Sequence, residues 1–66
     1  MDMIVNGKQV QVEGVTTVSQ LLEQLGFAGK RVAVEKNGEI VPKSRHAETA
    51  INGDDKLEIV VAVGGG

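Results

Sequence analysis

The sequence predicts an α+β fold in which a mixed sheet of about five strands packs on one main helix. Two Asn-Gly pairs, Asn6-Gly7 and Asn37-Gly38, lie between short apolar runs and are typical of two-residue β-hairpins. An amphipathic segment follows the first hairpin, and an apolar run precedes the last residues. A chain of 66 residues is expected to form one domain, here 1–66 with a flexible glycine tail at 64–66.

The helix carries the strongest local signals. Thr17 and Gln20 have the spacing of a capping box, in which each side chain binds the backbone N–H of the other residue. Gly26 stands where a left-handed residue can end the helix. Between them, apolar residues recur at the spacing of one helical face, and this face consists of Val18, Leu21, Leu22 and Leu25.

Alternation of apolar and polar residues predicts strands at 1–5, 9–13 and 32–34, and a short strand at 40–41 that Pro42 stops. The polar stretch that follows has room for one helical turn begun by Ser44. The last strand, 57–63, is apolar on both sides, which is typical of a central strand. The order is therefore hairpin, helix, hairpin and a final central strand.

Composition excludes several classes of function. Without cysteine the chain has no disulfide, thiolate metal site or cysteine nucleophile. A net charge of −2 and a single aromatic residue, Phe27, argue against nucleic-acid binding. No apolar run approaches the roughly 20 residues that span a bilayer, and the N-terminus lacks a signal segment. We expect a cytoplasmic protein that contacts neither nucleic acid nor membrane.

The side chains offer no recognisable catalytic or metal site. His46 is the only histidine and lies in a polar stretch, so it is predicted to be a solvated surface residue. Asp54, Asp55 and Glu58 form a candidate acidic patch, although such groups are more often a solvated face. Phosphate-binding glycine motifs are absent. We therefore predict no catalytic residue, no bound metal and no bound cofactor.

The end of the sequence is the remaining candidate for chemistry. Gly64, Gly65 and Gly66 are slender enough to thread into a partner's active site. A terminal carboxylate on Gly66 has a pKa of about 3.3–3.7 and is ionised at neutral pH. Attack on the α-phosphate of ATP would convert it into an acyl adenylate, and a sulfur donor could then displace AMP to leave a thiocarboxylate. Partners must supply every catalytic group. The alternative is a flexible end without function.

Several segments, spread over essentially the whole chain, match a known family pattern. They are Ile4-Val5-Asn6-Gly7, Thr17-Val18, Leu21-Leu22, Val32-Ala33-Val34-Glu35, Asn37-Gly38-Glu39-Ile40-Val41-Pro42-Lys43, Gly53-Asp54, Leu57-Glu58-Ile59-Val60 and Val63-Gly64-Gly65-Gly66. With these segments the chain resembles the ubiquitin-like sulfur carriers, which have a β-grasp fold, and most of all their thiamine-biosynthesis branch. Lys43 stands where this family pattern often has arginine.

The resemblance implies a carrier rather than an enzyme. An E1-like adenylyltransferase, which binds the ATP, would adenylate Gly66, and a sulfur-donating protein would supply the sulfur of the thiocarboxylate. Thiazole synthase would accept that sulfur. Ile4, Val60 and Ala62, whose parity places them opposite the helix-facing residues, are candidates for the partner interface or for packing against loops. A monomer is expected.

Three other hypotheses for the function are compatible with the sequence. The small subunit of molybdopterin synthase would use the same Gly66 chemistry within a two-subunit enzyme. A ubiquitin-like protein tag would instead be joined to lysine side chains. A plain binding domain would make no use of its terminal glycines.

Overall fold

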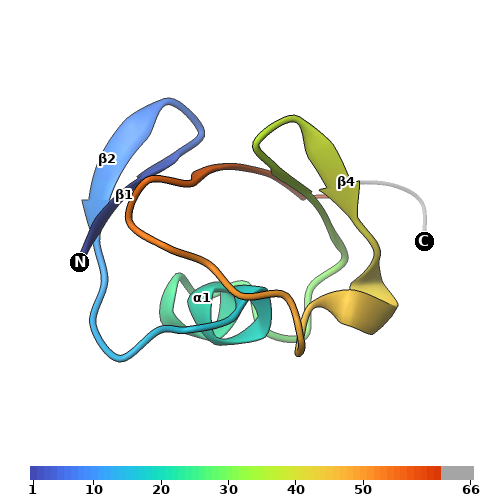
Figure 1. Cartoon of the computed structure of the whole chain (residues 1–66). Coiled ribbons are helices and arrows are strands. Elements are labelled where there is room, and N and C mark those ends of the chain that lie inside the picture. The colour runs from blue at the N-terminus through green and yellow to red at the C-terminus, as the bar shows by residue number, and fades with distance from the viewer. Residues whose placement is uncertain (62–66) are drawn as a thin grey trace.

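The computed structural model describes residues 1–61 of the chain. Five strands form one sheet, and the helix α1 lies across one face of this sheet (Figure 1). In chain order the elements are β1 (Asp2–Val5), β2 (Lys8–Gln11), α1 (Val18–Gln24), β3 (Val32–Lys36), β4 (Glu39–Val41), the 3₁₀ helix η1 (Lys43–Arg45) and β5 (Lys56–Val61).

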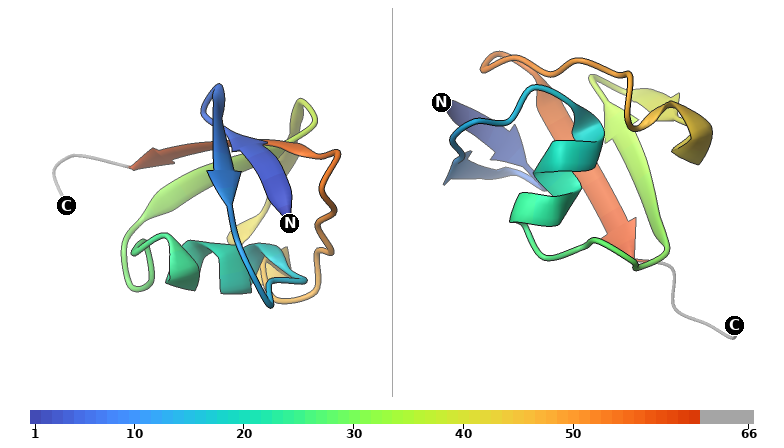
Figure 2. Two further views of the ribbon diagram at one scale, coloured as in Figure 1. Left: turned by 90° about the vertical axis from the view of Figure 1, so that its left-hand side faces the viewer. Right: turned by 90° about the horizontal axis from the view of Figure 1, so that it is seen from below.

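The strand order β2-β1-β5-β3-β4 confirms that the last strand is central. β1 and β5 run parallel, while the β1–β2, β3–β4 and β3–β5 pairs are antiparallel, so the sheet is mixed as predicted. The two views of Figure 2 show α1 on one side of the sheet, with β5 crossing above it. The opposite face of the sheet, here called the open face, has no helix over it in the described part of the chain (Figures 1 and 2).

Both predicted hairpins are present and have two-residue turns. Asn6 and Asn37 each have a φ of 53°, and the glycines after them have φ values of 79° and 86°. Positive φ at both central positions matches the right-handed twist of the flanking strands. The turns therefore fix the register of each hairpin, with Val5 opposite Lys8 and Lys36 opposite Glu39.

The helix ends follow the predicted capping signals. The Thr17 hydroxyl accepts a hydrogen bond from the backbone N–H of Gln20, and the Gln20 side chain accepts one from the backbone N–H of Thr17. At the other end, the Gly26 N–H donates to the Glu23 carbonyl oxygen (3.2 Å) and the Phe27 N–H to that of Leu22 (2.7 Å). These two bonds form a Schellman motif around Gly26, whose φ is 85°.

The core lies between α1 and the inner face of the sheet. Apolar residues of the helix, the inner face and two loop segments bury one another there, which supplies most of the driving force for folding. The buried apolar residues are Met3, Val5, Val12, Val15, Val18, Leu21, Leu22, Val34, Val41, Ile51, Leu57 and Ile59.

The prediction for His46 was wrong. The residue is buried, and its Nε2 lies 3.1 Å from the carbonyl oxygen of Val41. Its own carbonyl oxygen accepts a hydrogen bond from the Ser19 N–H at 2.9 Å. The turn η1, which begins at Lys43 rather than Ser44, brings the histidine back between β4 and α1. His46 therefore ties these elements together.

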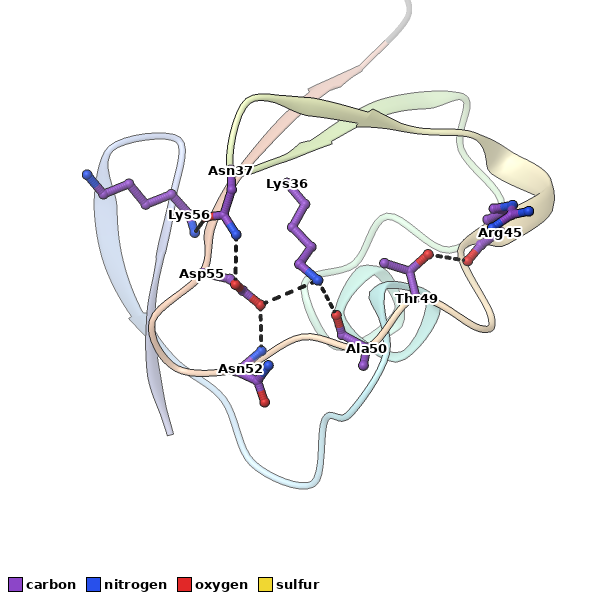
Figure 3. Close-up of polar contacts among 8 residues, drawn as sticks. All are labelled: Lys36, Asn37, Arg45, Thr49, Ala50, Asn52, Asp55 and Lys56. Atoms are coloured by element: carbon purple, nitrogen blue, oxygen red, sulfur yellow. Dashed lines mark hydrogen bonds and ion pairs between the residues drawn. The ribbon is translucent and has the colours of Figure 1, made fainter.

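Asp55 is likewise buried and does not belong to an exposed acidic patch. Its carboxylate accepts hydrogen bonds from the side-chain amide of Asn37 (2.8 Å) and the backbone N–H of Asn52 (2.7 Å), and Lys36 Nζ lies 3.9 Å away (Figure 3). Burial alone raises the pKa of Asp55, but the two hydrogen bonds and the Lys36 charge outweigh it and hold the pKa below its ordinary value of 3.8.

The turn asparagines hold β5 from both sides. At its start, the Asn37 side-chain oxygen accepts from the Lys56 N–H (2.9 Å), and the Asn37 N–H donates to the Lys56 carbonyl oxygen (2.8 Å). On the β1 side, the Asn6 side chain accepts from the Ile59 N–H (2.7 Å) and donates to the Ile59 carbonyl oxygen (3.1 Å). The Asn6 N–H also donates to the Leu57 carbonyl oxygen at 2.9 Å.

We predict that Asn6→Gly, which keeps the positive φ but removes the side chain, lowers the free energy of unfolding by about 1–3 kcal/mol because the Ile59 backbone groups lose their partners. Urea unfolding measures this loss. Asp54→Gly is the control for the entropic cost of a new glycine, because Asp54 is exposed and its side chain makes no hydrogen bond within residues 1–61. Equal losses in the two variants would contradict a role for the Asn6 side chain.

A second prediction concerns Asp55. Because its folded-state pKa is lowered, its charge contributes stability above the unfolded value of 3.8, and this contribution is lost as the pH falls through the folded-state pKa. Asp55→Asn should therefore be less stable than the wild type by about 1–3 kcal/mol at neutral pH. The difference should shrink as the pH is lowered below 3.8. Unfolding curves at several pH values test this, with the exposed Asp54→Asn as control. A difference that stays constant with pH would refute it.

Candidate functional site at the end of the central strand

The described end of β5 extends beyond β1, the neighbouring strand on one of its two sides. β1 pairs only with the first residues of β5, through Ile4–Lys56 and Val5–Leu57. Beyond this point the Asn6 side chain binds Ile59, and further pairing comes from β3 alone, up to the Val32–Val61 pair. The strand therefore continues toward the glycine residues while only one neighbouring strand supports it.

The last two described residues of β5 are apolar and accessible. Val60 is 62 % exposed and Val61 is 40 % exposed, although both follow the buried Ile59. The sequence predicted this strand to be apolar on both sides because it is central. The central place of β5 is confirmed. The side chain of Val60 nevertheless remains exposed among the described residues. An accessible apolar strand end beside the predicted reactive residues is suited to contact with a partner.

Three of the predicted site residues, Gly64, Gly65 and Gly66, lie outside the described residues, as does Ala62. Of the predicted interface residues, Ile4 and Val60 share the open face, as their parity indicated. They do not form one contact point, since Ile4 is half-buried opposite Lys56 and Val60 lies four residues further along β5, opposite Ala33.

The structure adds Ile40, Glu35 and Glu58 to this face. Ile40, on β4, is 77 % exposed, and it lies directly opposite Glu35 on β3. Glu35 in turn lies directly opposite Glu58 on β5. The sequence placed Glu58 only in a candidate acidic patch with Asp54 and Asp55, and it did not single out Ile40 or Glu35, although the two-residue Asn37-Gly38 turn contained the signal for these two residues. That turn fixes Ile40 opposite Glu35, and burial of the neighbouring pair Val34–Val41 then turns Ile40 and Glu35 outward.

Within residues 1–61, the fold offers little for catalysis by its own side chains. A hollow of about 380 Å³ beside α1 is lined by Ser19 and His46, but no hydrogen bond joins their side chains, so they do not form a nucleophile–base pair. No cluster of three or more metal-ligating side chains occurs in this part of the chain. None of the helices described here is long and apolar enough to cross a membrane.

Comparison with known proteins places these features in a family. The model of the ThiS family matches residues 3–66. The sulfur carrier protein ThiS of Bacillus subtilis is 42 % identical over 62 residues, a match that covers 92 % of this chain and 94 % of that protein. The crystal structure of the thiamine biosynthesis protein ThiS from Geobacter metallireducens superposes with a TM-score of 0.83 at 35 % identity, and each chain is covered completely.

A thiazole synthase of Paramagnetospirillum magneticum is 48 % identical over 66 residues, but this chain spans only 20 % of that protein's length. A thiazole synthase of Magnetococcus marinus shows the same partial coverage at 38 % identity. The family model matches nearly the whole chain, and the mixed sheet and single main helix are shared with the solved relative. Together these two findings assign the chain to a family. The chain belongs to the ThiS family and has the ubiquitin-like β-grasp fold of its solved relative.

Proposed function

We propose that this protein carries sulfur for thiazole formation in thiamine biosynthesis, as a thiocarboxylate on Gly66. One observation of the structure supports the proposal most directly: the anchored central strand β5 leads through the exposed Val60 and Val61 toward the three glycines. A strand fixed at its start and middle, with an accessible end, gives a partner a defined entry to the residues that follow.

The proposed chemistry has two steps, both catalysed by partners. A carboxylate oxygen of Gly66 attacks the α-phosphate of ATP and releases pyrophosphate, which gives an acyl adenylate. Sulfide (HS⁻) delivered by a sulfur-donating protein then attacks the acyl carbon and forms the C–S bond as AMP leaves, and loss of the S–H proton gives the thiocarboxylate. The adenylyltransferase binds the ATP, so the carrier is a co-substrate and not an enzyme. We propose that it acts as a cytoplasmic monomer, because its end must enter other proteins.

Thiazole synthase is the proposed acceptor of the sulfur. Two proteins named thiazole synthase contain a segment similar to this chain within a much longer sequence. The occurrence of a carrier-like segment in proteins of that name supports a functional association between the two. It does not favour the molybdopterin branch or a protein tag, so these remain outcomes of the test below.

We further propose that the open face docks the partners. Val60 is exposed there, and the half-buried Ile4 lies at a separate place on the same face, opposite Lys56 at the start of β5. Ala62, which follows on the same parity, is included in this proposal from the sequence alone. The interface needs only modest area, because the carrier must leave one partner for the next.

Intact mass spectrometry tests the proposed function. Incubated with the adenylyltransferase, ATP and a sulfur donor, the chain should gain the mass difference between sulfur and oxygen. A variant that lacks Gly65 and Gly66 should gain nothing, yet should unfold like the wild type because no side chain is removed. Rescue of a thiamine requirement by the wild type, but not by this variant, is expected in cells.

Several outcomes of this experiment would contradict the proposal. Full thiamine rescue by the variant without Gly65 and Gly66 would show that the glycines are dispensable. Conjugates of many masses in cells would indicate a protein tag. Rescue of molybdenum-cofactor loss in place of the thiamine requirement would assign the chain to molybdopterin synthesis. The mass of the chain isolated from cells also shows directly whether Gly66 has a free carboxylate.

A further inference from the structure

The open face contains a pair of like charges in an unfavourable position. Glu35 on β3 and Glu58 on β5 are directly opposite each other in the antiparallel ladder, and both lie on the face away from α1. Directly opposed residues have Cβ atoms about 4.5–5.5 Å apart, and like charges at this spacing destabilise a sheet. The ion pairs within residues 1–61 join Lys36 to Asp55 and Arg45 to Glu48, so neither glutamate is part of an ion pair there.

The surroundings of this glutamate pair are apolar on two sides and hollow on a third. Ile40 lies across the ladder from Glu35, and Ala33 and Val60 form the next pair along the strands. A hollow of about 470 Å³ lies beside both glutamates, and it is lined by Glu35, Asn37, Gly38, Asp54, Lys56 and Glu58. Three of the four charged residues that line it are acidic. The face thus combines an excess of negative charge, three acidic residues to one lysine, with exposed apolar side chains.

We infer that the Glu35–Glu58 pair receives an arginine side chain of the adenylating partner, while Ile40 and Val60 pack against apolar residues around that arginine. This inference rests on the proposed function. A guanidinium is planar, presents several N–H donors and has an apolar stem, so it suits two neighbouring carboxylates set in an apolar rim. Its charge would also relieve the repulsion between the glutamates.

The chemistry of the partner explains why it should be positive at this place. An enzyme that binds the triphosphate of ATP and an ionised carboxylate needs cationic groups around its active site. Glu58 lies in the middle of β5, two residues before the exposed Val60, so contacts to the glutamate pair and to Val60 would fix the direction of this strand relative to the partner. Docking through this pair would therefore orient the chain end toward the adenylating site.

The glutamate pair is expected to increase the rate at which the carrier associates with the adenylating partner and its selectivity for that partner. It is not expected to increase the stability of the free carrier. Complementary charges across an interface accelerate encounter and select between partners. Within the free protein the same two charges repel each other, so their removal should not destabilise the fold.

The test compares two double variants of the full chain. Glu35→Gln/Glu58→Gln removes the pair, and Glu13→Gln/Glu23→Gln makes the same change in net charge at exposed residues outside the open face. Binding to the adenylyltransferase of the same organism is measured by calorimetry at low and high salt. We expect the first variant to bind roughly tenfold more weakly than the wild type at low salt, with a smaller difference at high salt. The control should bind like the wild type.

Thermal unfolding completes the experiment. Glu35→Gln/Glu58→Gln should unfold at the same temperature as the wild type or at a higher one, which separates weak docking from poor folding. Unchanged binding of this variant, or an equal loss in the control, would overturn the inference. Different results would contradict the inference and the proposed function. If the wild type is never adenylated, the proposed function is wrong; if both variants are adenylated like the wild type, only the docking role is wrong.

Discussion

Two asparagine side chains hold the central strand β5 from opposite sides, and the position of the candidate site depends on this constraint. Asn37 binds the backbone of Lys56 at the start of the strand, and Asn6 binds the backbone of Ile59 near its end. Each asparagine also forms the left-handed corner of a hairpin turn. The same two residues therefore shape the hairpins and fix the strand between them.

The side chain of Asn6 completes the backbone hydrogen bonding of β5 where β1 ends. β1 is too short to accompany β5 along its length, so the backbone groups of Ile59 would lack a partner on that side. The Asn6 side-chain amide supplies both a donor and an acceptor there. Because unsatisfied backbone groups are costly, these hydrogen bonds of Asn6 allow β5 to continue beyond β1, paired with β3 alone and with Val60 and Val61 accessible. The proposed function needs this accessible strand end, because a partner has to reach the residues that follow it.

Local signals were sufficient to predict most of the fold. The Asn-Gly turns predicted both hairpins, the Thr17–Gln20 spacing predicted the start of the helix, and the two-sided apolar pattern of the last strand predicted its central place. The turn and capping signals depend on backbone geometry within a few residues, whereas the apolar pattern of the last strand depends on its burial on both faces. The chemistry assigned to Gly66 was likewise read from the sequence and lies beyond the described residues.

Contacts between distant segments were not predictable in the same way. His46 stands among polar residues, so nothing local indicated that η1 would turn it toward Val41 and bury it. Asp55 looked like one of several surface acids, yet its partners come from a hairpin 18 residues earlier as well as from its own turn. The glutamate pair of the open face required the register between β3 and β5, which only the folded sheet provides.

The central claim is that partners activate the free end of this chain, presented by a strand fixed in the sheet. The most direct measurement adds one bulky residue after Gly66, in a form that no protease removes, and follows the rate of sulfur transfer to thiazole synthase. The account predicts a folded protein that still docks on the adenylyltransferase but transfers no sulfur. Transfer at the full rate by this extended protein would contradict it.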